Sequence, residues 1–213
     1  MQVILEDDLR VKRYDEYCPI ACSLSLVGER WTLLVVRELM EGPKRYTDLV
    51  DGLPGIGTNI LAARLKDLEA AELVAKQKLP PPAASTVYEL TEAGRMLRPV
   101  LHELARFGAR YLGPPSADAL EPGWLLGALD LVVPPTAGDM VVAFRIGDEE
   151  ASIVDGRATP GLTGVADAIV DGDAEGFYRL FVDGELDAVR IEGDFRAVEH
   201  LVAAFRPSAP LPA

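Results

Sequence analysis

Residues 53–74, LPGIGTNILAARLKDLEAAELV, constrain the fold of this chain more than any other stretch. Leu61, Leu65 and Leu68 recur at helical spacing, which predicts an amphipathic helix with these leucines in the core. The LPGIG segment before it cannot continue a helix and predicts a tight turn, and residues 45–50 predict a shorter helix upstream. A short helix, a glycine turn and a longer helix are typical of a helix-turn-helix, whose second helix enters the DNA major groove.

The longer helix is expected to offer a polar outer face. With the leucines in the core, the 100° step per residue turns Asn59, Ala62, Ala63 and Lys66 outward, and Thr58 lies at the exposed N-terminal end. Hydrogen-bonding side chains can read base edges there, and alanines let a helix approach DNA closely. On this stretch alone, an ordinary amphipathic surface helix is an equal alternative.

The charges divide the sequence into two halves. The chain has 213 residues, enough for two modest domains, and a net charge of −13. Residues 1–113 hold 15 basic and 16 acidic residues, including every lysine, whereas residues 114–213 hold 6 basic and 18 acidic residues. Two domains with different partners are therefore expected, and only the first is suited to approach phosphates.

The sequence shows no sign of a membrane or secreted protein. It has no run of eighteen apolar residues, and its first residues lack the basic and apolar regions of a signal peptide. The two cysteines, Cys18 and Cys22, do not form a disulfide framework. We therefore expect a cytoplasmic protein with no membrane partner.

Further helices and a two-stranded wing are predicted around the helix-turn-helix. Helices are expected at residues 18–27 and 31–40. Strands are expected at residues 74–79 and 86–90, joined by a proline-rich loop, and they would form a wing beyond the recognition helix. Two lysines on one face of the first strand, Lys76 and Lys78, are suited to contact phosphates, although an exposed basic strand face is the simpler alternative.

A long helix with an apolar stripe is expected after the wing. Thr91 is its predicted N-cap, and the helix would reach about Leu112, with a kink or a split near Leu97 because Pro99 lies inside it. The stripe comprises Leu97, Val100, Leu101, Leu104, Phe107 and Tyr111. It is longer than one small domain needs to cover, so part of it is expected to form a homodimer interface.

Short motifs recur in a fixed order across residues 14–112. They are YCP at 17–19, LVGERWT at 26–32, GPKRY at 42–46, LPGI at 53–56, the residues Leu61, Arg64, Leu65 and Leu68, YELT at 88–91, and Gly94. Together they resemble the HxlR group of winged helix regulators, which are relatives of the MarR type. The resemblance implies a dimeric bacterial transcription factor that reads a two-fold symmetric operator in double-stranded DNA.

The resemblance also implies which residues contact DNA. The recognition positions would be Thr58, Asn59, Ala62 and Lys66, the wing contacts would be Lys76 and Lys78, and Arg45 and Arg64 would be phosphate-contacting or structural arginines. Gly57 stands where a hydroxyl residue is usual, Glu72 replaces a glycine, and the wing is rich in proline. These departures affect the operator sequence and the affinity more than the fold.

The second half predicts a separate α+β domain at residues 118–206, after a linker rich in proline and glycine; the first domain takes residues 1–113. Helices are expected at residues 124–133, 173–182 and 194–205, the last with Phe195, Val198, Leu201, Val202 and Phe205 facing inward. Strands are expected at residues 140–146, 150–154, 166–170 and 189–192, with a turn at Asp155 and Gly156.

Two segments of this half, AIVDGD at 168–173 and VRIEGD at 189–194, precede helices and resemble sterol-carrier-protein-like domains. That resemblance implies a sheet with helices on one face, enclosing an apolar tunnel for a ligand. The tunnel would be lined by Trp124, Phe144, Phe177 and Phe181, and the alternative is that all four are ordinary core. A domain with no lysine and a net charge of −12 favours a neutral or cationic apolar ligand.

No catalytic or metal-binding constellation can be assembled from the sequence. The two histidines, His102 and His200, fall in different expected domains, so neither a catalytic triad nor a histidine-rich metal site can be built. The acidic run 148–150 is expected to be a solvated turn. We therefore expect no enzymatic activity, no metal and no cofactor.

The cysteines are the remaining candidates for chemistry. Cys18 and Cys22 lie four residues apart on one helical face, near the upper limit of disulfide geometry. The HxlR resemblance implies that Cys18 aligns with an oxidant-sensing cysteine of several relatives, and burial in the core is the alternative.

These expectations describe a two-domain, DNA-binding transcriptional regulator of the α+β class, with an acidic C-terminal domain that binds an effector or a protein. The alternative is a carrier of lipid or another apolar ligand whose winged helix no longer binds DNA. The balanced charge of the first half and Gly57 keep that alternative open.

Overall fold

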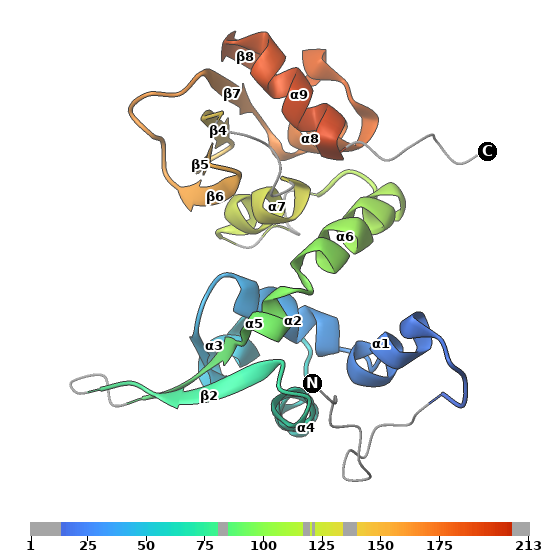
Figure 1. The fold of residues 1–213 in the computed structure, drawn as a ribbon. Helices are drawn as coiled ribbons and strands as arrows, with labels where there is room; N and C mark the ends of the chain where they lie inside the picture. Colours follow the sequence, from blue (N-terminus) through green and yellow to red (C-terminus); the bar gives the residue numbers. More distant parts are fainter. Residues whose placement is uncertain (1–13, 81–84, 117–119, 121, 134–139, 206–213) are drawn as a thin grey trace. The chain divides into compact units, whose positions relative to one another are not determined.

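The computed structural model describes residues 14–80, 85–116, 120, 122–133 and 140–205 (Figure 1). The chain divides into two compact units, Met1–Arg98 and Pro99–Ala213. Each unit combines helices with a sheet, which gives the α+β content that the sequence predicts.

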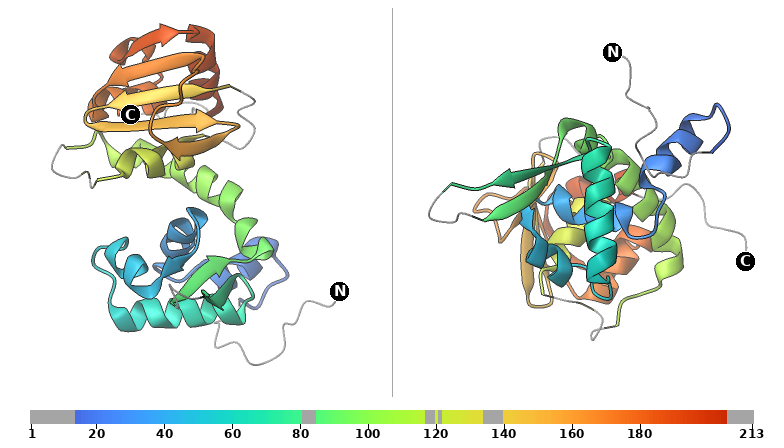
Figure 2. Two further views of the ribbon diagram at one scale, coloured as in Figure 1. Left: turned by 90° about the vertical axis from the view of Figure 1, so that its left-hand side faces the viewer. Right: turned by 90° about the horizontal axis from the view of Figure 1, so that it is seen from below.

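Helices and a small antiparallel sheet build the first unit. Its helices are α1 (Pro19–Val27), α2 (Thr32–Met40), α3 (Tyr46–Asp51), α4 (Thr58–Ala70) and α5 (Glu92–Arg95). Its strands are β1 (Lys44–Arg45), β2 (Val74–Lys78) and β3 (Thr86–Leu90), in the order β1-β3-β2. The predicted helix-turn-helix is confirmed as α3 and α4, and the predicted wing as the β2–β3 hairpin, which projects from the unit beside α4 (Figure 2).

The core of the first unit forms around one face of α4. Leu61 and Leu68 are fully buried and Leu65 is 2% exposed, as their spacing predicts. Other elements complete this core with Val35, Val36, Leu39, Leu49, Leu53, Val74, Val87 and Leu90. Burial of this apolar surface, rather than the helix propensity of α4 alone, stabilises the helix.

The turn after α4 holds Glu72 in an unusual backbone conformation. Glu72 has a positive φ of 56°, a left-handed conformation that side chains with a Cβ atom disfavour. Its carbonyl oxygen accepts a hydrogen bond of 2.7 Å from the Thr91 hydroxyl, which ties the turn to the end of β3. A glycine is therefore the natural residue at this position, and Glu72 adopts the conformation under strain.

The predicted long helix is split, as Pro99 suggests. Thr91 caps α5, because its hydroxyl accepts the backbone N–H of Gly94 at 3.1 Å, and α6 (Arg98–Leu112) begins after Leu97. Pro99 occupies the first turn of α6, where a missing N–H costs nothing.

Contacts assign α6 to the second unit, whereas the sequence places it in the first domain. The Nε atom of Arg106 donates to the carbonyl oxygen of Phe205 at 2.8 Å. His102 is 7% exposed, and its Nδ1 atom lies 2.9 Å from the carbonyl oxygen of Leu131. The domain limits 1–113 and 118–206 remain a prediction. They differ from the division after Arg98 mainly in where α6 is placed.

A five-stranded sheet forms the centre of the second unit. Its strands are β4 (Val142–Ile146), β5 (Glu149–Val154), β6 (Arg157–Pro160), β7 (Ala168–Gly172) and β8 (Arg190–Gly193), in the order β6-β5-β4-β7-β8. Strands β4 and β7 are parallel, and the other neighbours are antiparallel. Strand β6 was not predicted, because it is a short edge strand that ends in proline, and β7 begins and ends two residues later than predicted.

Helical segments of several kinds connect and cover this sheet. They are α7 (Trp124–Val132), α8 (Ala174–Tyr178), the π-helix η2 (Arg179–Asp183), the 3₁₀ turn η3 (Leu186–Ala188) and α9 (Phe195–Phe205). The helix expected at residues 173–182 thus changes to a π-helix after Tyr178. The expected inward position of Phe195 is wrong: this side chain is 49% exposed, because the buried face of α9 begins later, at Ala197 and Val198.

One face of the sheet shares an apolar core with α7, α8 and α9. Val142, Phe144 and Ile146 alternate onto this face from β4. Glu149 is not the solvated turn residue that the sequence suggests, because its Oε2 atom accepts the backbone N–H of Leu125 at 2.9 Å and thereby caps α7.

Candidate nucleic-acid interface

The outer face of α4 carries the residues expected to read DNA bases. Thr58, Asn59, Ala62 and Lys66 are all exposed, on the side of the helix opposite the buried leucines. Gly57 is the N-cap of α4 and makes no side-chain cap hydrogen bond, so this helix begins without a capping side chain. The geometry presents two hydrogen-bonding side chains, one ammonium group and one methyl group to a partner.

Helix α3 holds the start of α4 in place. The hydroxyl of Tyr46, the first residue of α3, donates to the carbonyl oxygen of Thr58 at 2.7 Å. The turn between the helices is anchored by Ile56, which is 8% exposed, and Gly55 supplies a positive φ of 85°. Sequence reasoning did not find the role of Tyr46, and only its position in the GPKRY motif signals it.

The two arginines with undecided roles lie in different surroundings. Arg64 faces inward with 17% of its side chain exposed, and its guanidinium pairs with Glu29 at 3.5 Å and with Asp67 at 3.1 Å. Arg45 is exposed and caps α3, where its backbone N–H donates to Asp48 Oδ2 at 2.8 Å. This placement favours a structural role for Arg64 and leaves Arg45 accessible to phosphate.

The wing lysines lie on the solvent side of β2. Lys76 and Lys78 are both exposed, and the Nζ atom of Lys76 is 5.4 Å from the centre of the Tyr88 ring, a cation–π contact across the hairpin. The two ammonium groups therefore follow one strand beside α4, where a phosphate backbone can meet them.

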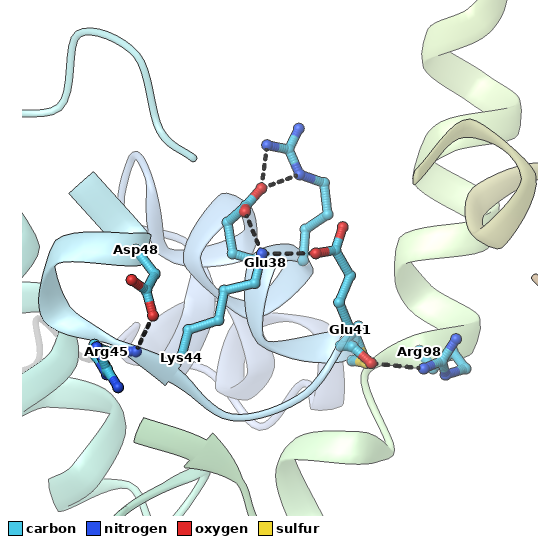
Figure 3. Close-up of polar contacts among 8 residues, drawn as sticks. Glu38, Glu41, Lys44, Arg45, Asp48 and Arg98 are labelled. Carbon is cyan, nitrogen blue, oxygen red and sulfur yellow. Dashed lines mark hydrogen bonds and ion pairs between the residues drawn. The ribbon is translucent and has the colours of Figure 1, made fainter. Parts of the chain in front are cut away.

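A network of charged groups that the sequence analysis missed supports this region (Figure 3). Glu38 on α2 has only 9% of its side chain exposed, and its carboxylate accepts hydrogen bonds from Arg37 at 2.7 Å and from Lys44 at 2.9 Å. Lys44 also binds Glu41 at 2.6 Å. The available sequence signal was spacing. Glu38 follows the apolar Val35 by three residues and therefore lies on the same side of α2 as Val35, which the structure shows to be fully buried.

The charge of Lys44 is stabilised by this network. Burial lowers the pKa of its ammonium group, but the hydrogen bonds to Glu41 and Glu38 and the negative charges of both carboxylates outweigh burial, so the pKa is raised above its ordinary value. Lys44 therefore remains protonated and keeps β1 fixed to α2.

Arg98, the last residue of the first unit, contacts the end of α2. Its guanidinium donates to the carbonyl oxygen of Met40 at 3.1 Å (Figure 3). The last carbonyls of a helix lack helical partners, so this bond caps α2.

The second unit brings together the four residues expected to line a ligand tunnel. The ring of Phe177 lies 5.5 Å from Trp124, 6.2 Å from Phe144 and 4.9 Å from Phe181, measured between centroids. The three phenylalanines are at most 5% exposed, and Trp124 packs against the same core. The arrangement is one of aromatic side chains packed on one another.

The cysteines are free thiols with different exposure. Cys18 is half-buried at the N-cap of α1, and Cys22 is exposed one turn later, which contradicts burial as the explanation for Cys22. Within the described ranges, no group of three or more histidine, cysteine or acidic residues is placed to hold a metal ion.

The described part of the chain contains no single helix of the length and apolar character needed to cross a membrane; α1 and α2, which meet at a bend of 80°, meet these criteria only as a pair.

Comparisons with known proteins match the first part of the chain. The HxlR-like helix-turn-helix family matches residues 26–116. The chain is 38% identical to the HTH-type transcriptional regulator YodB of Bacillus subtilis over 98 residues, which are 46% of this chain and 88% of YodB. It is 35% identical to the uncharacterized HTH-type transcriptional regulator sll1512 of Synechocystis over 101 residues, 47% of this chain and 75% of that protein.

A solved structure is similar over the same portion. The reduced form of YodB from B. subtilis aligns with 47% of this chain and 100% of its own, at 36% identity and a TM-score of 0.41.

Proposed function

The chain belongs to the HxlR-like helix-turn-helix family of DNA-binding transcriptional regulators, and we propose that it binds a two-fold symmetric operator as a homodimer under the control of its second unit. The observation that carries this proposal is the exposed face of α4. Thr58, Asn59 and Lys66 lie on it, beside the lysine-bearing wing, and buried leucines fix the opposite face. This helix would enter the major groove, and Lys76 and Lys78 would contact the phosphate backbone.

The outer face of α6 supports the proposed dimer. Val100, Leu104, Phe107 and Tyr111 are 45%, 45%, 60% and 62% exposed, although each side chain is large and apolar. They recur at helical spacing on the side of α6 opposite the buried Leu101 and His102. A contiguous apolar stripe of this kind favours a protein partner, and a second copy of α6 would meet it with an identical stripe.

We assign the second unit a regulatory role because its charge is unsuited to DNA. The excess of acidic residues after residue 113 repels phosphate, so this unit would act on DNA binding indirectly. A neutral or cationic apolar effector remains the proposed ligand class.

A carrier of apolar ligands is the second candidate function. The nearly neutral charge of residues 1–113 favours it, because many DNA-binding domains carry a clear excess of basic residues. In that case the winged helix would be a dimerisation module, and the second unit would carry the activity.

Binding of the full chain to the DNA that flanks its own gene discriminates these functions. Fluorescence anisotropy would compare that duplex with a random duplex of equal length, between about 50 and 200 mM salt. A regulator binds the flanking duplex more tightly, and its affinity falls steeply with salt because phosphate contacts release counterions. Equal, weak binding to both duplexes at every salt concentration would contradict the proposal and favour the carrier.

A further inference from the structure

A groove on the second unit is lined by none of the four aromatic residues that were expected to line a ligand tunnel. It has a volume of about 610 Å³ and is lined by Gly184, Glu185, Leu186, Asp187, Val189, Ile191 and Phe195. This volume is within the range of small-molecule sites, about 300–1,000 Å³. The lining comes from η3, β8, the first residue of α9 and the residues that flank η3, which all lie within residues 184–195 and belong to one unit.

Unusual backbone structure precedes this groove. The π-helix η2 ends at Asp183, and its C-cap Gly184, the first lining residue, has a positive φ of 75°. Helical segments with this hydrogen-bond pattern are rare and are frequently found at functional sites. The irregularity is therefore independent of the groove's volume and favours the same location.

Two glycines, Gly172 and Gly176, allow residues 188 and 189 to pack closely against β7 and α8. A Cβ atom at Gly172 would be 3.0 Å from Val189 Cγ1, and one at Gly176 would be 2.6 Å from the carbonyl oxygen of Ala188. Both glycines therefore let the segment before β8 pack against β7 and α8. Val189 is held against the core while Phe195, at the other wall, remains 49% exposed.

The rim of the groove is acidic. Glu185 binds the guanidinium of Arg179, and the charges of Glu175 and Asp187 also act on that group, which raises the pKa of Arg179 above its ordinary value. The groove lining itself contains two carboxylates, Glu185 and Asp187, and no basic residue, which leaves an excess of negative charge along the groove.

From this juxtaposition we propose that the groove binds a small organic cation with an apolar body. The apolar part would contact Leu186, Ile191 and Phe195, and the positive group would lie near Asp187 and Glu185. The acidic rim disfavours a carboxylate or phosphate ligand, because either would meet like charges.

Helix α9 connects this groove to α6. Phe195 at its first position lines the groove, and the carbonyl oxygen of Phe205 at its last position accepts the hydrogen bond from Arg106 of α6. A ligand that shifts α9 would change this bond and, through the α6 stripe, the dimer. This consequence rests on the proposed function, whereas binding in the groove does not.

The binding test uses the full chain and three probes with a ten-carbon chain that differ in charge: decyltrimethylammonium and decanoate, each below its critical micelle concentration, and decanol below its solubility limit. Calorimetry is expected to show that the protein binds the cation most tightly, the alcohol less tightly and decanoate least tightly. Phe195→Ala should lower the affinity for the cation by about fivefold or more. Asp187→Asn should lower the affinity for the cation without lowering the affinity for the alcohol. Leu162→Ala and Asp155→Asn alter an exposed leucine and an exposed aspartate of the same unit outside the groove, and should leave all affinities unchanged.

The proposed site would be wrong if decanoate bound as tightly as the cation. It would also be wrong if Phe195→Ala and Leu162→Ala lowered the affinity for the cation equally. Because Phe195 is half-exposed, its truncation should leave the fold intact, and circular dichroism of each variant verifies this.

The regulatory arm measures affinity for the flanking duplex with and without decyltrimethylammonium. Arg106→Gln is expected to keep cation binding but to abolish the change in DNA affinity. A chain that binds the cation in the groove but no DNA would refute the proposed function and leave the site standing. A chain that binds the duplex but not the cation would refute the site alone.

Discussion

The Nζ atom of Lys44 lies 2.9 Å from the Oε2 atom of Glu38, and this ion pair joins β1 to α2 beneath the helix-turn-helix. The side chains are 20% and 9% exposed, so solvent screens the pair less than it screens a surface salt bridge. Strand β1 leads directly into α3, which in turn bonds the start of α4 through Tyr46. The pair therefore contributes to the position of the recognition helix.

Removing the ammonium group should destabilise the first unit. Lys44→Met keeps the length of the side chain but leaves the carboxylate of Glu38 with Arg37 alone, and we expect a loss of about 1–3 kcal/mol in the free energy of unfolding. The raised pKa of Lys44 means that the folded state holds its proton more tightly than the unfolded state. The advantage of wild type over Lys44→Met is thus complete below about pH 10.4 and is lost as the pH rises through the folded pKa.

Urea unfolding at pH 7, 9 and 11 measures this difference. Glu41→Gln is the matched control, because Glu41 is 46% exposed and its removal should cost at most about 1 kcal/mol. A difference between wild type and Lys44→Met that grows between pH 9 and 11 would contradict the assignment.

Residues proposed to read bases and residues proposed to contact phosphate should respond differently to substitution. Asn59→Ala and Lys66→Ala alter the exposed face of α4, so each should cost about 1–3 kcal/mol on the operator and much less on random DNA. Lys78→Ala should weaken both DNAs alike and reduce the salt slope by about one. Anisotropy titrations at several salt concentrations measure both effects, and equal losses for all three variants on both DNAs would show that α4 does not read bases.

Relieving the strained turn should stabilise the first unit. Glu72→Gly removes the Cβ atom at a φ of 56°, and we expect a gain of about 0.5–1 kcal/mol after subtracting the greater flexibility of glycine in the unfolded chain. Glu72→Ala keeps the Cβ atom and removes only the carboxylate, so it should not share the gain. Thermal unfolding of the two variants distinguishes backbone strain from a charge effect.

A charge placed in the α6 stripe should dissociate the proposed dimer. Phe107 is 60% exposed in the isolated chain, so Phe107→Glu should not disturb the fold, but it would bury two carboxylates at a symmetric interface. Light scattering should then report a monomer, with weaker operator binding. Val165→Glu, at an 86% exposed position of the same unit, is the control and should remain dimeric. If the Phe107→Glu variant remained dimeric, α6 would not be part of the dimer interface.

Truncating the central aromatic ring tests whether the four aromatic residues are core or ligand lining. Phe177 is 5% exposed and contacts three other rings, so Phe177→Ala should cost about 3–5 kcal/mol as packed core. Denaturant unfolding followed by circular dichroism measures it. A loss below about 1 kcal/mol would instead favour a ligand-lining role.

Local sequence patterns predicted the first unit well because its signals are strong and short in range. The spacing of Leu61, Leu65 and Leu68 determines which face of α4 is buried, and Pro99 determines where the helix after the wing divides. The second unit was predicted less completely. The sequence of β6 is too short and too polar to stand out, and its pairing with β5 forms only in the assembled sheet.

The sequence predicted which face of α4 is exposed, but it did not predict the contacts that support this helix. Thr58, Asn59 and Lys66 followed from helical geometry, whereas the Tyr46–Thr58 bond and the Glu38–Lys44 pair depend on how elements pack. Arg64 shows the same limit: its position on α4 was known, but its partner Glu29 lies 35 residues earlier in the chain. Phe195 was misplaced because helical periodicity does not reveal where a helix leaves the core.

The two tryptophans give each unit its own spectroscopic probe. Trp31 precedes α2 in the first unit, with the guanidinium of Arg30 5.6 Å from its ring centre, and Trp124 begins α7 in the second unit, edge-on to Phe177. Trp31→Phe and Trp124→Phe therefore produce single-emitter proteins, and the intrinsic fluorescence of each follows one unit during unfolding, DNA binding or ligand binding. The order in which the two units respond to an effector can then be resolved in time without any attached dye.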